Sequence, residues 1–131
     1  MNDLTWHCQL VLQNDQDCAT ACECLVTHVM NHVYHDMDGN PFPDQKRIRT
    51  YFLSRFICCY VDEITDNTDN GSRSYNPMTA EIICGAIQEI DFRRIAEDMI
   101  GNYTPKSAEE VAESEEFFNV MGFGDYDIIE D

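Results

Sequence analysis

The longest run of helically spaced apolar residues lies at residues 48–64. On a helical projection the main apolar residues of this stretch cover about half of the circumference. Tyr51 and Cys58 add apolar surface on the other half. A helix that is apolar on most of its sides is usually enclosed by other elements. The sequence therefore predicts a central buried helix here, and its apolar half consists of Phe52, Leu53, Phe56, Ile57, Cys59, Tyr60 and Ile64.

Two patterns precede this helix. Apolar and polar residues alternate over residues 4–12, which favours a short strand, and a helical start to the next element is the alternative. Residues 14–17 then supply capping side chains for a helix that runs to about His35. A loop with glycine and prolines follows at residues 38–43. The inward stripe expected on the helix is Cys18, Cys22, Leu25, Val26, Val29, Met30 and Val33.

A polar segment and a further helix follow the central one. Residues 66–75, DNTDNGSRSY, predict an exposed loop because they combine glycine with residues that favour turns. Asn76 and Pro77 then predict a helix start, since proline is favoured at the first helical position. The residues expected to face inward on this helix are Ile82, Ile83, Ala86, Ile87 and Ile90.

The last two predicted helices are shorter. Asp91 begins one of them, and Gly101 ends it. Ser107 and Glu110 have the spacing of a capping box, which predicts a final helix that runs to about Met121. Together these patterns predict a mainly α single domain over residues 1–131, either all-α or α+β. The expected architecture is a compact bundle of four to five helices around the central helix, with a short N-terminal strand as its only β element.

Composition narrows the class of protein. No run of about 18 apolar residues is present, so we expect no membrane span. The first residues lack the basic and apolar regions of a secretory signal. Seven cysteines without the spacing of a disulfide framework predict reduced thiols. We therefore expect a cytoplasmic protein, located in the host cytoplasm if the chain is viral.

Charge is distributed unevenly along the chain. The net charge is −17, with 25 acidic residues against 8 basic ones. All lysines and arginines fall within residues 46–106. The two flanking segments contain aspartate and glutamate but no lysine or arginine. Such self-repulsion costs stability, and solubility alone needs a net charge of only about 2–8 in a small domain. The pattern therefore predicts a neutral packed middle with two anionic outer surfaces, and residues 122–131 are expected to form a partly mobile acidic tail.

Cys24, His28, His32 and His35 are the weak candidates for a metal site. On one continuous helix they would fall within about 80° of one another, and imidazole and thiolate are zinc ligands. The stripe lies at the edge of the apolar face, however, and structural zinc sites usually draw ligands from two elements. A histidine-rich polar flank is therefore the preferred interpretation, and no metal or cofactor is predicted.

Other catalytic motifs are missing. The segment that begins at Asp66 fails as a calcium loop, because Thr68 and Pro77 occupy ligand positions. There is no glycine-rich phosphate loop and no zinc-type cysteine spacing, so no catalytic residue is predicted, although a spatial Cys–His pair stays open. Direct binding to nucleic acid is not expected at this charge. The basic cluster is interpreted as neutralising carboxylates of neighbouring helices, and it consists of Lys46, Arg47, Arg49 and Arg55.

The last helix carries the densest row of carboxylates. Side chains one helical turn apart are about 5–6 Å apart at Cβ, and extended glutamates widen this spacing toward that of successive phosphates. We therefore predict that this surface occupies a basic, nucleic-acid-binding site of a partner or host-defence protein. The expected contacts are Glu109, Glu110, Glu113, Glu115 and Glu116, with Asp125, Asp127, Glu130 and Asp131 as secondary contacts.

In size and charge alone the chain resembles the small acidic anti-restriction and anti-CRISPR proteins of bacteriophages. No motif accompanies the resemblance, so it assigns no residue role. Two other classes stay open. One is a helical adaptor or assembly subunit that binds through an apolar patch, and the other is a metal-binding protein or enzyme that uses the histidine stripe. The oligomeric state is also open, including a homodimer. The adaptor patch would consist of Phe117, Phe118, Phe123 and Tyr126.

Overall fold

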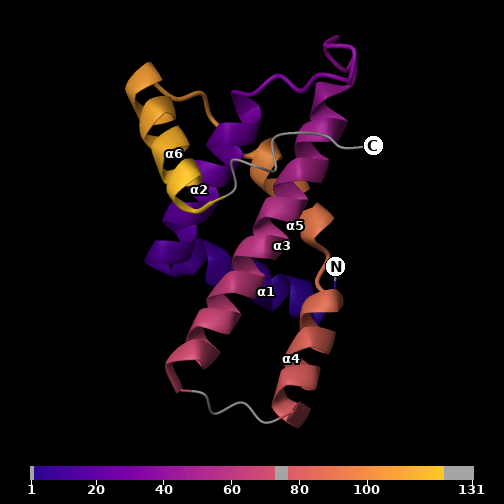
Figure 1. Ribbon diagram of the computed structural model, residues 1–131, viewed down its shortest axis with the longest axis vertical. Coiled ribbons are helices and arrows are strands. Elements are labelled where there is room, and N and C mark those ends of the chain that lie inside the picture. The colour runs from indigo at the N-terminus through magenta and orange to yellow at the C-terminus, as the bar shows by residue number, and fades with distance from the viewer. Residues whose placement is uncertain (1, 73–76, 123–131) are drawn as a thin grey trace.

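Six helices and no strand make up the described part of the chain. The computed structural model describes residues 2–72 and 77–122, with side chains except at residues 66–72, 77, 79 and 80. The mainly α prediction is confirmed, but six helices replace the four or five expected. No helix within these ranges combines the length and the apolar character that a membrane crossing requires. The helices are α1 (Asp3–Asn14), α2 (Gln16–Met30), α3 (Gln45–Ser72), α4 (Pro77–Gln88), α5 (Phe92–Gly101) and α6 (Ala108–Val120) (Figure 1).

The predicted N-terminal strand is wrong, because residues 4–12 lie within α1. The Asn2 side chain accepts a hydrogen bond from the Thr5 N–H at 2.7 Å and so caps the start of this helix. Asp15 separates α1 from α2 and caps α2, since its carboxylate accepts from the Cys18 N–H at 3.0 Å. Capping side chains at the N-termini of both helices outweigh the short alternation of apolar residues. The alternating residues do not share one buried face, because Leu12 is buried and Trp6 is exposed.

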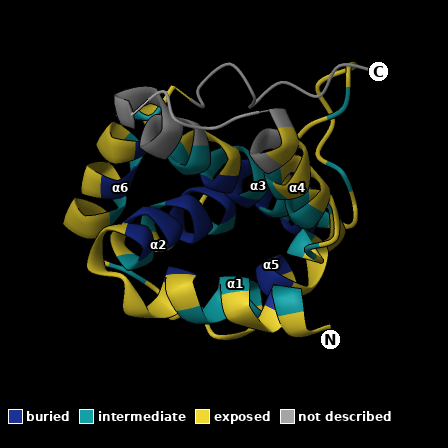
Figure 2. Cartoon of the chain, turned by 90° about the horizontal axis from the view of Figure 1, so that it is seen from below, coloured by how far each residue is buried: buried dark blue, intermediate teal, exposed yellow. Residues whose placement is uncertain are grey.

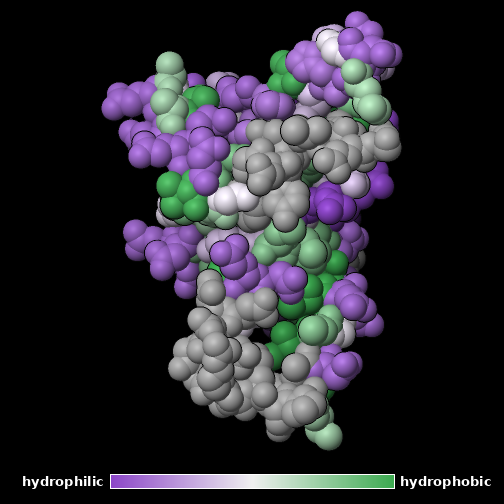
Figure 3. All heavy atoms as spheres, in the orientation of Figure 1, coloured by the Kyte–Doolittle hydropathy of each residue, from purple (hydrophilic) through white to green (hydrophobic). Residues whose placement is uncertain are grey.

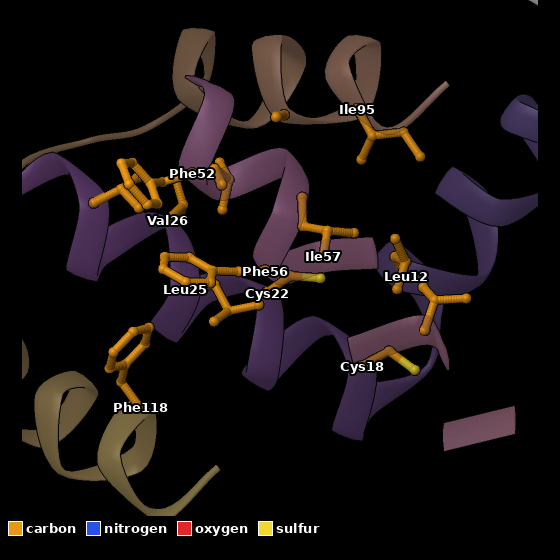
Figure 4. Close-up of a cluster of buried hydrophobic side chains, with 14 of the residues drawn as sticks. Leu12, Cys18, Cys22, Leu25, Val26, Phe52, Phe56, Ile57, Ile95 and Phe118 are labelled. Carbon is orange, nitrogen blue, oxygen red and sulfur yellow. The ribbon is translucent and has the colours of Figure 1, made fainter. Parts of the chain in front are cut away.

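The core lies where α2 and α3 pack against each other. α2 also contacts α1, α5 and α6, and α5 packs along α3. Figure 2 shows the buried residues gathered on α2 and α3, inside a rim of exposed residues on the outer helices. One face of the predicted central helix is therefore buried, whereas Tyr51 on its other half is 52% exposed, and α2 shares the central position. The fully enclosed side chains from these two helices include Leu25, Val29, Leu53, Phe56 and Ile57. Figure 4 labels Leu25, Phe56 and Ile57 among them.

α2 ends earlier than its pattern predicts. The helix stops at Met30, and Val33, which was expected in the core, is exposed. Gln45 at the start of α3 holds the loop that follows α2. Its side-chain amide accepts a hydrogen bond from the Tyr34 N–H at 2.9 Å and donates to the Tyr34 and Phe42 carbonyls at 2.8 Å each. The first of these bonds satisfies the Tyr34 N–H, which a longer α2 would have paired internally, and the other two satisfy carbonyls of the loop. Tyr34 is thereby buried and stacks on Phe52.

α3 and α4 extend as an arm beyond the core (Figure 1). α3 continues through residue 72, so the predicted loop is wrong for residues 66–72, and residues 73–76 lie outside the described ranges. Extending a formed helix adds a hydrogen bond with each residue, which offsets the weak helix preference of aspartate and asparagine. α4 begins at Pro77 as predicted, yet its expected core residue Ile82 is 64% exposed.

The last two helices follow the sequence patterns closely. Asp91 caps α5, with its carboxylate 3.1 Å from the Arg94 N–H, and α5 ends at Gly101. Ile95 and Ala96 are its buried residues. α6 has the predicted capping box and ends just before Gly122, whose φ of 86° suits glycine.

Two isoleucines on different helices test this division between core and arm. Replacing fully buried Ile57 with alanine should lower the free energy of unfolding by about 2–5 kcal/mol, because it leaves a cavity in the core. The same change at Ile82 should alter it by less than about 0.5 kcal/mol, because this side chain lies mostly in solvent. Urea unfolding of both variants, followed by circular dichroism, measures the difference. Equal losses would contradict the packing described for α4.

Candidate functional site

The candidate site is built on α6, which starts at a complete capping box. The Ser107 hydroxyl accepts a hydrogen bond from the Glu110 N–H at 3.2 Å, and the Glu110 carboxylate accepts from the Ser107 N–H at 3.1 Å. This backbone donor holds the pKa of Glu110 below its ordinary value, so the side chain stays ionised. Glutamates in the first turn also interact favourably with the helix dipole. The same charges that make the surface acidic therefore stabilise the helix that carries them.

The predicted row of five glutamates is divided between two faces of α6. Glu109, Glu110, Glu113 and Glu116 are exposed, whereas Glu115 bonds to the buried His28 and keeps 43% of its side chain exposed. Hydrophilic side chains predominate over α6, at the upper left of Figure 3. The signal for this division is present in the sequence, because Val111, Glu115 and Phe118 follow the helical spacing of an inward stripe.

Phe118 joins α6 to the core through an aromatic stack. Its ring is fully buried and lies parallel to the His28 ring, with 3.7 Å between centroids and 6° between planes. The Phe56 ring meets Phe118 edge-on at 5.1 Å. The His28 imidazole, itself buried on α2, hydrogen-bonds through Nδ1 to Glu115 Oε2. One turn of α6 is thus held by both packing and a charged hydrogen bond.

The connector before α6 is fixed to α2 at two points. The ammonium group of Lys106 lies 2.7 Å from Glu23 Oε1 and 5.9 Å from the centre of the Tyr103 ring. The Glu23 carboxylate raises the pKa of Lys106 above its ordinary value. The Asn31 side chain donates to the Tyr103 hydroxyl at 2.9 Å. With Phe118 packed near its other end, α6 is therefore held to α2 along its length, and its exposed face has a defined orientation.

The histidine stripe does not form the single helical face that the metal hypothesis requires. α2 ends at Met30, so His32 and His35 lie on the following loop. His28 faces Glu115 and Phe118, and His35 is exposed beside Pro41. Over residues 2–72 and 77–122, no three histidine, cysteine, aspartate or glutamate side chains form a group that could hold a metal ion.

Burial raises the thiol pKa of six cysteines, namely Cys8, Cys18, Cys22, Cys24, Cys58 and Cys59. All seven cysteines are free, and they lie within the described ranges. Burial raises the pKa of Cys8 to about 11 and that of Cys22 to about 12. Burial also raises the pKa of Cys24, whose neighbours include the Glu23 and Glu113 carboxylates. A nucleophilic cysteine needs the opposite environment, with a nearby cation or a helix N-terminus that lowers the pKa.

The three arginines of the basic cluster make contacts of three different kinds. Arg47 lies 3.5 Å from Asp44, one turn before it. Arg49 donates to the His32 carbonyl from Nε at 3.1 Å and from Nη2 at 2.8 Å, and so ties α3 to the loop after α2. The Arg55 guanidinium lies over the Tyr51 ring. In the described part of the chain, only Arg47 of this cluster pairs with a carboxylate, and that carboxylate is not on a neighbouring helix, so neutralisation of neighbouring helices stays a prediction.

The structure describes only part of the predicted adaptor patch and none of the secondary acidic contacts. Phe118 is buried and Phe117 is 36% exposed, so the two phenylalanines of the adaptor hypothesis do not form one patch. The secondary acidic contacts and the remaining adaptor residues lie outside the described ranges, and these are Asp125, Asp127, Glu130, Asp131, Phe123 and Tyr126. Comparison of the chain with protein-family models, curated proteins and solved structures finds no match.

Two adjacent glutamates on α6 test the contact between Glu115 and His28. Glu115→Gln should lower the free energy of unfolding by about 1–2 kcal/mol, because it removes the charged partner of the buried His28 ring. Glu116→Gln makes the same change in net charge at an exposed position and should change stability by less than about 0.5 kcal/mol. Thermal and urea unfolding of the two variants provide the measurement. A larger loss in Glu116→Gln would contradict the contact between Glu115 and His28.

Thiol alkylation tests the environment of the cysteines. At neutral pH, iodoacetamide should modify exposed Cys84 first, while Cys18 and Cys22 stay protected. Because the pKa of Cys22 is raised to about 12, its thiolate fraction at neutral pH is very small, and its burial slows the reaction further. Peptide mass spectrometry after timed labelling measures the order. Rapid labelling of Cys22 in the folded protein would contradict this environment.

Proposed function

We propose that this protein is a small non-catalytic binding protein that presents the exposed carboxylates of α6 to a basic, nucleic-acid-binding surface of a partner protein. The specific proposal is an anti-defence inhibitor that acts as a nucleic-acid mimic in the cytoplasm. The observation that supports it is the combination of charge and anchoring on one helix. Glu109, Glu113 and Glu116 are exposed on successive turns, while Phe118 and Glu115 hold the same helix to α2.

Electrostatics supports this use of α6. The segment from residue 107 onward contains no lysine or arginine, so no cation of its own neutralises the row. A surface of one sign attracts a surface of the opposite sign during diffusion and can raise association rates by about 10–1000-fold. Preorganisation adds to this, because carboxylates on an anchored helix lose less freedom on binding than carboxylates on a loose segment.

An adaptor function is the second candidate, and the exposed apolar residues of α4 favour it. Met78 is 72% exposed and Ile82 is 64% exposed, and they lie one helical turn apart on the same side. An adaptor that used this side of α4 would bind almost independently of salt, because apolar contacts are not screened. Salt dependence therefore separates the two functions.

Charge reversal on α6, with a matched control, tests the proposed function. The triple variant Glu109→Lys, Glu113→Lys and Glu116→Lys leaves the capping residue Glu110 and the anchor Glu115 in place. The control triple variant reverses three exposed glutamates elsewhere, namely Glu63, Glu81 and Glu89. Both variants change the net charge equally. A partner captured from host extract by the native chain should lose about tenfold or more in affinity for the α6 variant, and much less for the control.

Three outcomes of that experiment have different meanings. Native affinity that falls steeply between roughly 50 and 200 mM salt, with competition by the partner's nucleic acid, supports the mimic. Equal weakening by the two triple variants would show that overall charge rather than α6 is recognised, and would contradict the proposal. Unchanged binding by the α6 variant, with little salt dependence, would favour the adaptor function.

A further inference from the structure

A groove of about 260 Å³ lies between α1, α2 and α5. Apolar side chains from all three helices line it, among them Leu12, Val26 and Ile95. Glu23 and Asp98 contribute carboxylates to the lining, from α2 and α5. An apolar surface bordered by anionic groups is suited to a side chain that is aliphatic along its length and cationic at its end.

Asp98 is held in place and keeps acceptor capacity. Its Oδ2 accepts a hydrogen bond from the Gln9 side-chain amide at 3.1 Å, which ties α5 to α1 across the groove. Its Oδ1 lies 3.8 Å from Arg94 Nε, in a pair that is largely open to solvent on the arginine side. A carboxylate can accept about four hydrogen bonds, so Asp98 is able to bind a further donor. Its side chain is 36% exposed, which leaves it accessible.

The chain's own Lys106 illustrates what this lining attracts. Its ammonium group bonds to Glu23 and lies near the face of Tyr103, and both residues line the groove. A carboxylate next to an aromatic face is a favourable environment for an organic cation. Lys106 therefore engages the carboxylate of Glu23, while the carboxylate of Asp98, with its remaining acceptor capacity, can bind an external cation.

We propose that this groove receives an arginine side chain from a basic segment of the partner, with its aliphatic part on the apolar lining and its guanidinium on Asp98. Arginine fits better than lysine, because its planar guanidinium can donate to one carboxylate through two N–H groups and is more weakly hydrated. The groove thus provides a specific pocket beside a general electrostatic surface. This inference rests on the proposed function, since it names the side chain by which the cationic partner is recognised.

Fluorescent peptides test the groove directly on the full chain. The probe is a short peptide with one arginine between two leucines, and the control peptide carries citrulline, a neutral isostere, in its place. Asp98→Asn should weaken binding of the arginine peptide about tenfold, because it removes one charged hydrogen-bonding partner. Glu97→Gln is the matched control, since Glu97 lies next to Asp98 on α5 and also pairs with an arginine one turn before it. The affinity of the Glu97→Gln variant for the arginine peptide should stay within about twofold of the native value.

Filling the groove provides a second, charge-independent variant. Ala19 lines the groove, and Ala19→Leu should reduce peptide affinity about tenfold by occupying the space. Thr20→Leu places the same side chain on the exposed neighbouring position of α2 and should leave binding unchanged. Circular dichroism confirms that each variant is folded.

The outcomes distinguish the groove from the surface of α6. The α6 triple variant should keep most of its affinity for the arginine peptide at moderate salt while losing the captured partner. Equal binding of the arginine and citrulline peptides, or equal effects of Asp98→Asn and Glu97→Gln, would overturn the groove proposal. If partner binding depends on α6 but survives Ala19→Leu unchanged, the proposed function stands and the groove proposal is wrong.

Discussion

The stack between His28 and Phe118 is the contact on which the position of α6 and its exposed carboxylates depends. α6 packs mainly on α2, and without this contact its 13 residues would form only a marginal helix in water. The imidazole is well suited to this position, because its ring packs like an aromatic hydrocarbon while Nδ1 bonds to Glu115. The edge contact from Phe56 extends the stack to α3, so the acidic helix is connected to both central helices.

The arrangement of charge follows from this anchoring. Carboxylates that would repel one another in a flexible chain are distributed over capped helices, where Glu110 and Asp15 each satisfy backbone N–H groups. Those bonds hold the pKa values of both carboxyls below their ordinary values, so the charges persist into mildly acidic conditions. Lys106 connects the two anionic regions, because Glu23 and Tyr103 of the groove hold it just before α6 begins. The α6 surface and the groove are therefore parts of one structural unit around α2.

Two side chains that could in principle be reactive, a thiol and an imidazole on α2, are part of the packed core. Cys22 and His28 of α2 are both buried, and burial raises the pKa of the Cys22 thiol to about 12. A thiol and an imidazole at these positions contribute to the core as small apolar and aromatic groups. The accessible features that offer specificity are instead the carboxylates of α6, the groove and the apolar side of α4. The proposed recognition of another molecule rests on these three features.

The sequence by itself determined the mainly α class, the buried middle of α3, the caps of α5 and α6, and the concentration of acids near the C-terminus, because these follow from local spacing and charge. It predicted a strand at α1, a longer α2 and an exposed loop at residues 66–72, where short patterns compete with capping and helix extension. Only tertiary structure decided that Glu115 bonds to His28, that Ile82 stays exposed, and that Asp98 and Glu23 border one groove. Each of these depends on contacts between residues far apart in the chain, and neither helical periodicity nor composition contains that information.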